Sequence, residues 1–246
     1  MTNGMTHQEA LCVTSMNAEY FGRRILENIN FTVKAGQTYG LIGLNGVGKT
    51  TLIKIALGLK EPEAGGITIF GDAAGIPEAK AKIAYLPERF DPPWFLKGGE
   101  FVQFVAKLYG RAAPTEDMEK ACGLLALDPS VLKNKVQTYS KGMRQKLGLI
   151  ATVLSGCPML ILDEPMSGLD PLARALVKNM LGAVKREGRT VILSSHILAD
   201  MDEICDCVTV IDSGGTPFIG TPEELKNRAN EVYLEKAFLK VINRAA

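Results

Sequence analysis

Apolar residues along the chain follow two different spacings. Short apolar runs at 38–43, 83–86, 159–162 and 190–194 are bounded by turn residues, as is typical of strands buried on both faces of a sheet. Between them, Phe101, Val105 and Leu108 recur at helical spacing. The sequence therefore predicts an α/β fold with a mostly parallel central sheet and a helical insertion at about 88–158.

The two ends of the chain carry patterns of their own. Residues 11–34 contain two candidate strands joined by a turn, which predicts an N-terminal antiparallel β-subdomain. Apolar residues at 208–211 and 216–219 flank a serine-glycine turn and predict a hairpin, followed by a C-terminal helix at about 222–246. Because there is no internal repeat and no low-complexity linker, we expect one domain over residues 1–246.

Composition and charge exclude several classes of protein. A net charge of +1 provides no broad basic surface, so nucleic acid is not an expected partner. No apolar run reaches the ~18 residues of a membrane span. The polar N-terminus lacks the apolar stretch of a signal peptide, so we expect the chain to be soluble by itself. Five scattered cysteines, an odd number, favour buried thiols over a disulfide framework.

A glycine-rich segment follows the strand at 38–43. It matches the pattern G-x-x-x-x-G-K-[ST] with the residues Gly43-Leu44-Asn45-Gly46-Val47-Gly48-Lys49-Thr50. Such a loop turns consecutive backbone N–H groups toward phosphates at a helix N-terminus. Lys49 is then placed for the β- and γ-phosphates, and the Thr50 hydroxyl for Mg²⁺. The alternative is a simple glycine turn, but the strand–loop–helix context favours a nucleotide-phosphate site.

The strand at 159–162 ends in two carboxylates, Asp163 and Glu164. The carboxyl ends of parallel strands are where α/β sheets bind ligands, so Asp163 is a candidate magnesium ligand. Glu164 is a candidate general base for an attacking water. Alone, the pair could be an acidic turn after a strand. The phosphate loop upstream favours the catalytic interpretation.

Two further segments follow the acidic strand. Residues 167–170 precede a helix for which Asp170 is the expected N-cap. His196 follows the strand at 190–194, and the other histidine, His7, lies in the N-terminal tail. A lone histidine at a strand end is often a structural group. In a sheet that carries a phosphate loop, we instead expect His196 to donate to the γ-phosphate.

A second helix start has the features of an anion site. Ser140 is the expected N-cap of a long helix to about residue 154, and Gly142 lies in its first turn. One phosphate loop does not need a second such site. A helix start presented to the γ-phosphate of a neighbouring molecule would need one.

These motifs, in this order from about residue 11 to 225, resemble the nucleotide-binding subunits of ABC transporters. The resemblance implies that Tyr20 stacks on adenine and that Glu164, His196 and Lys49 are catalytic. It also implies that Ser140 and Gly142 contact the ATP of a second subunit, and that ATP and Mg²⁺ are the cofactors. The implied Walker A contacts to ATP are Gly43, Asn45, Gly46, Val47, Gly48, Lys49, Thr50 and Thr51.

Two segments depart from the pattern of that family. Residues 139–143 stand where the signature LSGGQ is expected, and they retain only Ser140 and Gly142. Glu88 replaces a usual glutamine, and its carboxylate would ligate Mg²⁺ together with Thr50 and Asp163. Both variants resemble the ABC-2 type of exporter, in which the ATPase and membrane subunits are separate chains.

The function implied by the resemblance is an ATPase that powers a transporter. Two nucleotide-binding domains, expected as a homodimer, would sandwich ATP and drive a separate membrane permease at the cytoplasmic face of the cell membrane. Aromatic residues at 90–95 would either dock that permease or fold back onto the insertion. The alternatives are an ABC ATPase that acts on ribosomes or DNA, and another P-loop enzyme. The N-K-x-D motif of a GTPase is absent from the sequence, and a kinase would not need the Ser140 segment.

Overall fold

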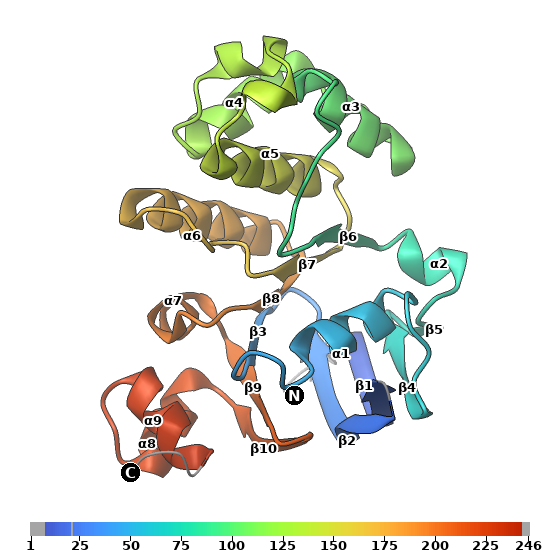
Figure 1. Ribbon diagram of the computed structural model, residues 1–246, viewed down its shortest axis with the longest axis vertical. Coiled ribbons are helices and arrows are strands. Elements are labelled where there is room, and N and C mark those ends of the chain that lie inside the picture. The colour runs from blue at the N-terminus through green and yellow to red at the C-terminus, as the bar shows by residue number, and fades with distance from the viewer. Residues whose placement is uncertain (1–7, 21, 243–246) are drawn as a thin grey trace, which may run out of the picture.

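The computed structural model describes residues 8–20 and 22–242, which form an α/β structure with two sheets (Figure 1). The larger sheet has the strand order β10-β9-β3-β8-β7-β6, with parallel pairing throughout except that β10 is antiparallel to β9. The mostly parallel sheet and the terminal hairpin are thereby confirmed. Its strands are β3 (Thr38–Ile42), β6 (Ile83–Leu86), β7 (Met159–Asp163), β8 (Thr190–Ser194), β9 (Cys207–Asp212) and β10 (Gly215–Gly220).

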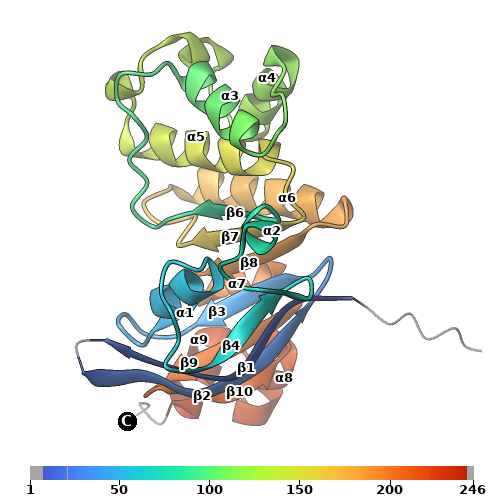
Figure 2. The ribbon, with the colours of Figure 1, turned by 90° about the vertical axis from the view of Figure 1, so that its right-hand side faces the viewer.

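The smaller sheet is antiparallel, with the order β2-β1-β4-β5. Figure 2 shows it beside α1 (Lys49–Ala56), at the opposite end of the molecule from the helical insertion. This sheet confirms the expected N-terminal β-subdomain and adds the two-residue strand β5, which the sequence did not indicate. Its strands are β1 (Glu9–Tyr20), β2 (Arg23–Lys34), β4 (Ala64–Ile69) and β5 (Asp72–Ala73).

The remaining helices cover the larger sheet or form the insertion. The short helix α2 (Pro77–Lys80) precedes β6. Helix α6 (Pro171–Arg186) follows β7, and helix α7 (Leu198–Ile204) follows β8. Between β6 and β7 the chain is helical, as expected. This insertion contains α3 (Gly98–Leu108), α4 (Thr115–Leu124), the 3₁₀ turns η1 (Pro129–Lys133) and η2 (Val136–Thr138), and α5 (Lys141–Leu154).

The central strands are buried on both faces and divide the interior into two cores. Because successive side chains of a strand point to opposite faces, Met159 and Ile161 of β7 pack with β1, β2 and α1. Leu160 and Leu162 pack on the other face, with the helices α3 to α7. This double burial explains why β7 is a continuous apolar run rather than an alternating one.

The C-terminal segment differs from the single helix expected at about 222–246. It forms two helices, α8 (Pro222–Ala229) and α9 (Leu234–Val241). Asn230 ends α8 with a φ of 52°, a left-handed conformation that asparagine tolerates and that terminates helices. Leu234 and Phe238 of α9 are then buried in the core. Residues 243–246 and residues 1–7, which include His7, lie outside the described parts of the chain.

Candidate active site

A cavity of about 350 Å³ opens where the carboxyl ends of β3, β7 and β8 meet the start of α1. It brings together segments that are far apart in the sequence, as the parallel sheet predicts. The cavity is lined by Asn45, Gly46, Gly48, Lys49, Thr50, Thr51, Glu88, Asp163, Glu164 and His196. Most of the residues expected in the Walker A loop, both acidic residues and the histidine therefore share one site.

The glycine-rich loop depends on glycine at particular positions. Gly48 has a φ of 111°, and a Cβ there would lie 2.7 Å from Cδ2 of Leu26. A Cβ on Gly43 would lie 2.6 Å from the Ile211 carbonyl oxygen. The close approach of β2 and β9 therefore leaves no room for side chains at these two positions. The loop is held tightly against both strands.

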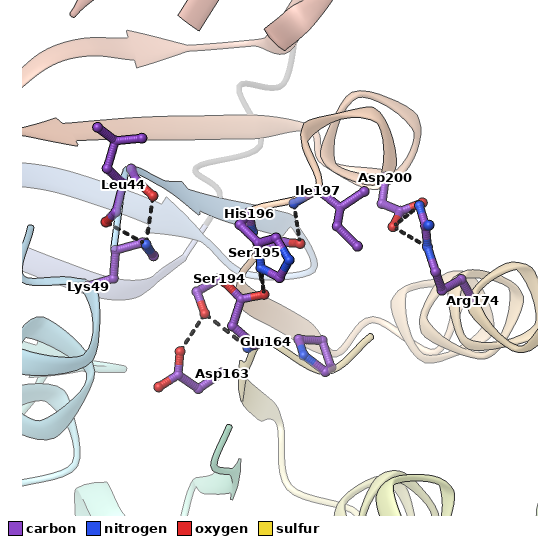
Figure 3. A network of polar contacts seen from close by, with 12 residues as sticks. Leu44, Lys49, Asp163, Glu164, Arg174, Ser194, Ser195, His196, Ile197 and Asp200 are labelled. Atoms are coloured by element: carbon purple, nitrogen blue, oxygen red, sulfur yellow. Dashed lines mark hydrogen bonds and ion pairs between the residues drawn. The ribbon is translucent and has the colours of Figure 1, made fainter. Parts of the chain in front are cut away.

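Lys49 begins α1 with its side chain inside the loop. The residue is 8% exposed, and its ammonium donates to the carbonyls of Gly43 at 2.7 Å and Leu44 at 3.1 Å (Figure 3). Burial lowers the pKa of Lys49, although the nearby carboxylates of Glu164, Asp163 and Glu88 oppose this shift. The loop carbonyls thus hold a buried cation that points toward the site where phosphates would bind.

Asp163 is the last residue of β7 and is 2% exposed. Its Oδ2 accepts a hydrogen bond from the Thr50 hydroxyl at 3.1 Å, and its Oδ1 accepts one from the Ser194 hydroxyl at 2.5 Å. Ser194 Oγ also accepts from the backbone N–H of Glu164 at 3.0 Å. These bonds fix the carboxylate between the phosphate loop and β8. Figure 3 shows the two bonds made by Ser194.

Glu164 turns out of β7 with a φ of 51°, which is unusual for a residue other than glycine. The residue is 7% exposed, and its Oε2 lies 2.7 Å from Nδ1 of His196. The His196 side chain is half exposed. The strained turn therefore places the carboxylate against the histidine at the cavity. Backbone strain of this kind is common at functional sites.

Ser140 and Gly142 do not line this cavity. Ser140 is exposed and caps α5 by accepting from the Met143 N–H at 3.2 Å, as predicted. The start of α5 packs instead on the loop at residues 167–170: a Cβ on Gly142 would lie 3.7 Å from Cδ2 of Leu169. The two sets of predicted ATP contacts are thus separate within one chain.

Three other predicted ATP contacts also lie outside the cavity lining. Gly43 contributes only its carbonyl to Lys49, and the Val47 side chain packs beneath the loop against the core that contains β1 and β2. Tyr20 is the last residue of β1 and is 52% exposed.

Comparisons with known proteins agree with this arrangement. Residues 26–167 match the family described as ABC transporter. The chain belongs to this family. A solved ATP-binding subunit of an ABC transporter superimposes with a TM-score of 0.86 and 30% identity, covering 94% of this chain and 99% of that one.

Curated relatives of this ABC protein include one from Synechocystis sp., the uncharacterized ABC transporter ATP-binding protein sll0415. It is 37% identical over 77% of this chain and 54% of its own length. The Nod factor export ATP-binding protein I of Ralstonia nicotianae is 31% identical over 90% of this chain and 70% of its own length. The chain spans only 54 to 64% of the length of the first three relatives that it matches.

Ser194 is a site residue of this ABC protein that local sequence patterns did not predict. The parallel register pairs Asp163 with Ser194, which explains how one hydroxyl reaches both acidic residues. A signal was present in the sequence. Ser194 and Ser195 end an apolar strand with two polar residues, and a fully buried serine at a strand end needs a hydrogen-bonding partner.

The oxygen atoms in the ABC site fit Mg²⁺. Within the described residues no group of three or more His, Cys, Asp or Glu side chains could hold a metal ion. Mg²⁺ does not need such a group, because it is usually bound by one or two carboxylates together with phosphates and water. The Thr50 hydroxyl and the Asp163 carboxylate, 3.1 Å apart in the same cavity, are suitable ligands.

Proposed function

We propose that this chain binds and hydrolyses ATP as one of two nucleotide-binding domains of an ABC transporter. One observation carries the proposal: the cavity that contains Lys49, Asp163 and Glu164 lacks Ser140 and Gly142 from the same chain. A second protomer, facing the first, would bring its own Ser140 segment to the open side of that cavity. Two identical protomers would then enclose two ATP molecules.

The residues of the cavity have distinct proposed roles. Lys49 and the N–H groups at the start of α1 would bind the β- and γ-phosphates, where helix N-termini favour anions. Bound Mg²⁺ would offset phosphate charge, held by Thr50 and Asp163 and approached by Glu88, which also lines the cavity. Tyr20 would stack on adenine.

The contact between Glu164 and His196 supports a role in hydrolysis. Glu164 would accept a proton from the attacking water, since it is the buried carboxylate at the cavity mouth. His196, whose Nδ1 faces Oε2 of Glu164 at 2.7 Å, would orient that carboxylate and, with both ring nitrogens protonated, donate to the γ-phosphate through Nε2. The proposed general base and the proposed γ-phosphate donor are therefore in direct contact.

A size-exclusion experiment tests the paired arrangement. The Glu164→Gln variant should still bind ATP but hydrolyse it slowly, so ATP should hold two protomers together long enough to elute as a dimer. Without nucleotide the same variant should elute later. A monomeric elution volume in saturating ATP and Mg²⁺ would contradict the sandwich.

The loop after β6 supports docking to a membrane subunit. Phe90 folds back, with its ring 5.6 Å from that of Phe101, whereas Trp94 and Phe95 are 66% and 57% exposed. Phe90 therefore follows the second alternative for this segment, and Trp94 and Phe95 are the residues proposed to dock. In the described residues no helix is long and apolar enough to cross a membrane.

Export is the proposed direction of transport, and the cytoplasmic face of the membrane the proposed location. The relative from Ralstonia nicotianae named for Nod factor export supports this direction. Gene neighbourhood tests the proposal against a soluble ABC ATPase. An adjacent gene for several membrane-spanning helices is expected, and a neighbourhood of ribosomal or DNA-repair genes would contradict it.

A further inference from the structure

A buried ion cluster joins the two helices that follow the site. Asp200, in the first turn of α7, is buried. Its Oδ2 accepts from Arg174 through Nη2 at 2.7 Å and Nε at 2.9 Å, and its Oδ1 lies 3.3 Å from Nζ of Lys178. Both cations belong to α6. Figure 3 shows the Arg174–Asp200 pair in the same view as the contact between Glu164 and His196.

Each of the two helices begins immediately after a loop of the site. Asp170 caps α6 by accepting from the Ala173 N–H at 2.9 Å, so α6 starts where the loop at residues 167–170 ends. On the other side, α7 starts at Leu198, two residues after His196. Through α6 and α7, the cluster therefore connects the end of the loop at residues 167–170 to His196.

The chain carries two half-sites for ATP, namely the cavity that contains Lys49 and the Ser140 segment at the start of α5. The loop at residues 167–170 lies between them. It starts next to Glu164, whose carbonyl accepts from the Ser167 N–H at 3.1 Å. Its other side carries the start of α5: the Lys141 side chain runs over Gly168, and Gly142 faces Leu169. A partner that contacts the Ser140 segment would therefore press on this loop as well.

The charges of this cluster form a rigid connection between α6 and α7. A buried carboxylate without partners is strongly unfavourable, so Asp200 holds α6 and α7 in one relative position. Both Arg174 contacts converge on Oδ2 of Asp200, and hydrogen bonds between charged groups are stronger than those between neutral groups. The hydrogen bond to Asp200 is the largest cause of a raised pKa for Arg174.

We infer that Arg174, Lys178 and Asp200 are positioning residues that couple the loop at residues 167–170 to His196. Through them, docking of a second protomer on the Ser140 segment sets the position of the histidine against Glu164. This inference rests on the proposed function, because it assigns a control element to the same ATP site. None of the three residues lines the cavity itself.

The test compares two variants of α7 in the full-length chain. Asp200→Asn removes the charge that binds α6. Asp202→Asn is the matched control, because Asp202 is on the same helix but pairs with Lys226 of α8 at 3.0 Å. Steady-state ATP hydrolysis gives kcat and KM for each. A displaced catalytic group costs rate rather than affinity, so Asp200→Asn should lower kcat about 10- to 100-fold and keep KM within about twofold.

A second pair of variants separates positioning from folding. Arg174 is partly exposed, so Arg174→Leu should fold, and it should lower kcat as Asp200→Asn does. Arg174→Lys keeps the charge but loses the second bond, and it should recover part of the rate. The concentration of folded protein in each sample is measured by titration with a fluorescent ATP analogue. If kcat per folded site equals that of the wild type in Asp200→Asn, the cluster is only structural and the inference is wrong.

A double variant tests whether the cluster acts through His196. In single-turnover assays, Asp200→Asn combined with His196→Ala should be no slower than His196→Ala alone, because groups that act as a unit are not additive. A further loss of rate in the double variant would overturn the inference. The Glu164→Gln variant is run beside them: if it hydrolyses ATP at the wild-type rate, the proposed function fails rather than the coupling.

Discussion

The two half-sites of this chain are built in different ways. Lys49, Asp163 and Glu164 are at most 8% exposed, and hydrogen bonds join each of them to a neighbouring loop or strand. Ser140 lies on the surface, and its described side-chain contact is to its own helix. The first half-site is thus part of the folded core, whereas the second is a surface that becomes functional only when another protomer covers it.

This difference has an energetic meaning. Buried charges are tolerated only where hydrogen bonds replace water, so the core half-site must be fully formed before any ligand arrives. The surface half-site carries no such requirement. Variants of the core half-site should therefore affect chemistry and stability together, and variants of the surface half-site should affect chemistry through pairing of protomers.

The largest expected effect is in the core half-site. Glu164→Gln should lower kcat for ATP hydrolysis by about 10² or more, the usual contribution of a positioned general base. Affinity for ATP, measured with a fluorescent analogue, should stay within about twofold, since the amide keeps the shape of the side chain. Glu78→Gln on the exposed surface of α2 is the control. Equal loss of rate in both variants would show that Glu164 has no special role.

Lys49→Ala should weaken nucleotide binding rather than catalysis alone. A hydrogen bond from a charged group contributes about 1.5–3 kcal/mol, which corresponds to an increase in Kd of about 10- to 160-fold. Titration with the fluorescent analogue measures it. The control is Lys54→Ala, an exposed lysine of the same helix. A Kd for Lys49→Ala that matches the control would contradict phosphate contact by this residue.

Ser194→Ala tests how the core half-site is held together. The change removes the hydrogen bonds of Asp163 Oδ1 and of the Glu164 N–H in a buried region, while Oδ2 of Asp163 keeps its bond from Thr50. An unsatisfied buried group costs about 1–3 kcal/mol, so the free energy of unfolding in urea should fall by that amount. The fall should be accompanied by slower hydrolysis. Unchanged stability would mean that this serine does not support the two acidic residues.

The smallest effect on stability is expected in the surface half-site. Ser140→Ala removes an N-cap and should cost about 1 kcal/mol. Thr221→Ala is the matched control, because Thr221 caps α8 in the same way, accepting from the Glu224 N–H at 3.0 Å. Only Ser140→Ala should reduce ATP hydrolysis, and wild-type specific activity should fall on dilution. Equal activity in the two variants would remove the distinction between core and surface half-sites.

Local patterns were enough to predict most of the fold and part of the site. The apolar runs predicted β3, β6, β7 and β8, because strands buried on both faces are almost continuously apolar. The phosphate loop, both acidic residues and the cap residues Ser140 and Asp170 were each recognisable from a few adjacent residues. The C-terminal pair of helices was not, since the break at Asn230 depends on one left-handed residue.

The sequence by itself therefore determined which chemical groups this chain carries, because glycine spacing, strand ends and caps are local properties. Only the tertiary structure decided which groups meet. Parallel register placed Ser194 beside Asp163, and the packing of α7 on α6 placed Asp200 against Arg174. These contacts join residues 26 and 31 positions apart, and no short-range pattern can specify them. They depend on how whole strands and helices pack around two shared cores.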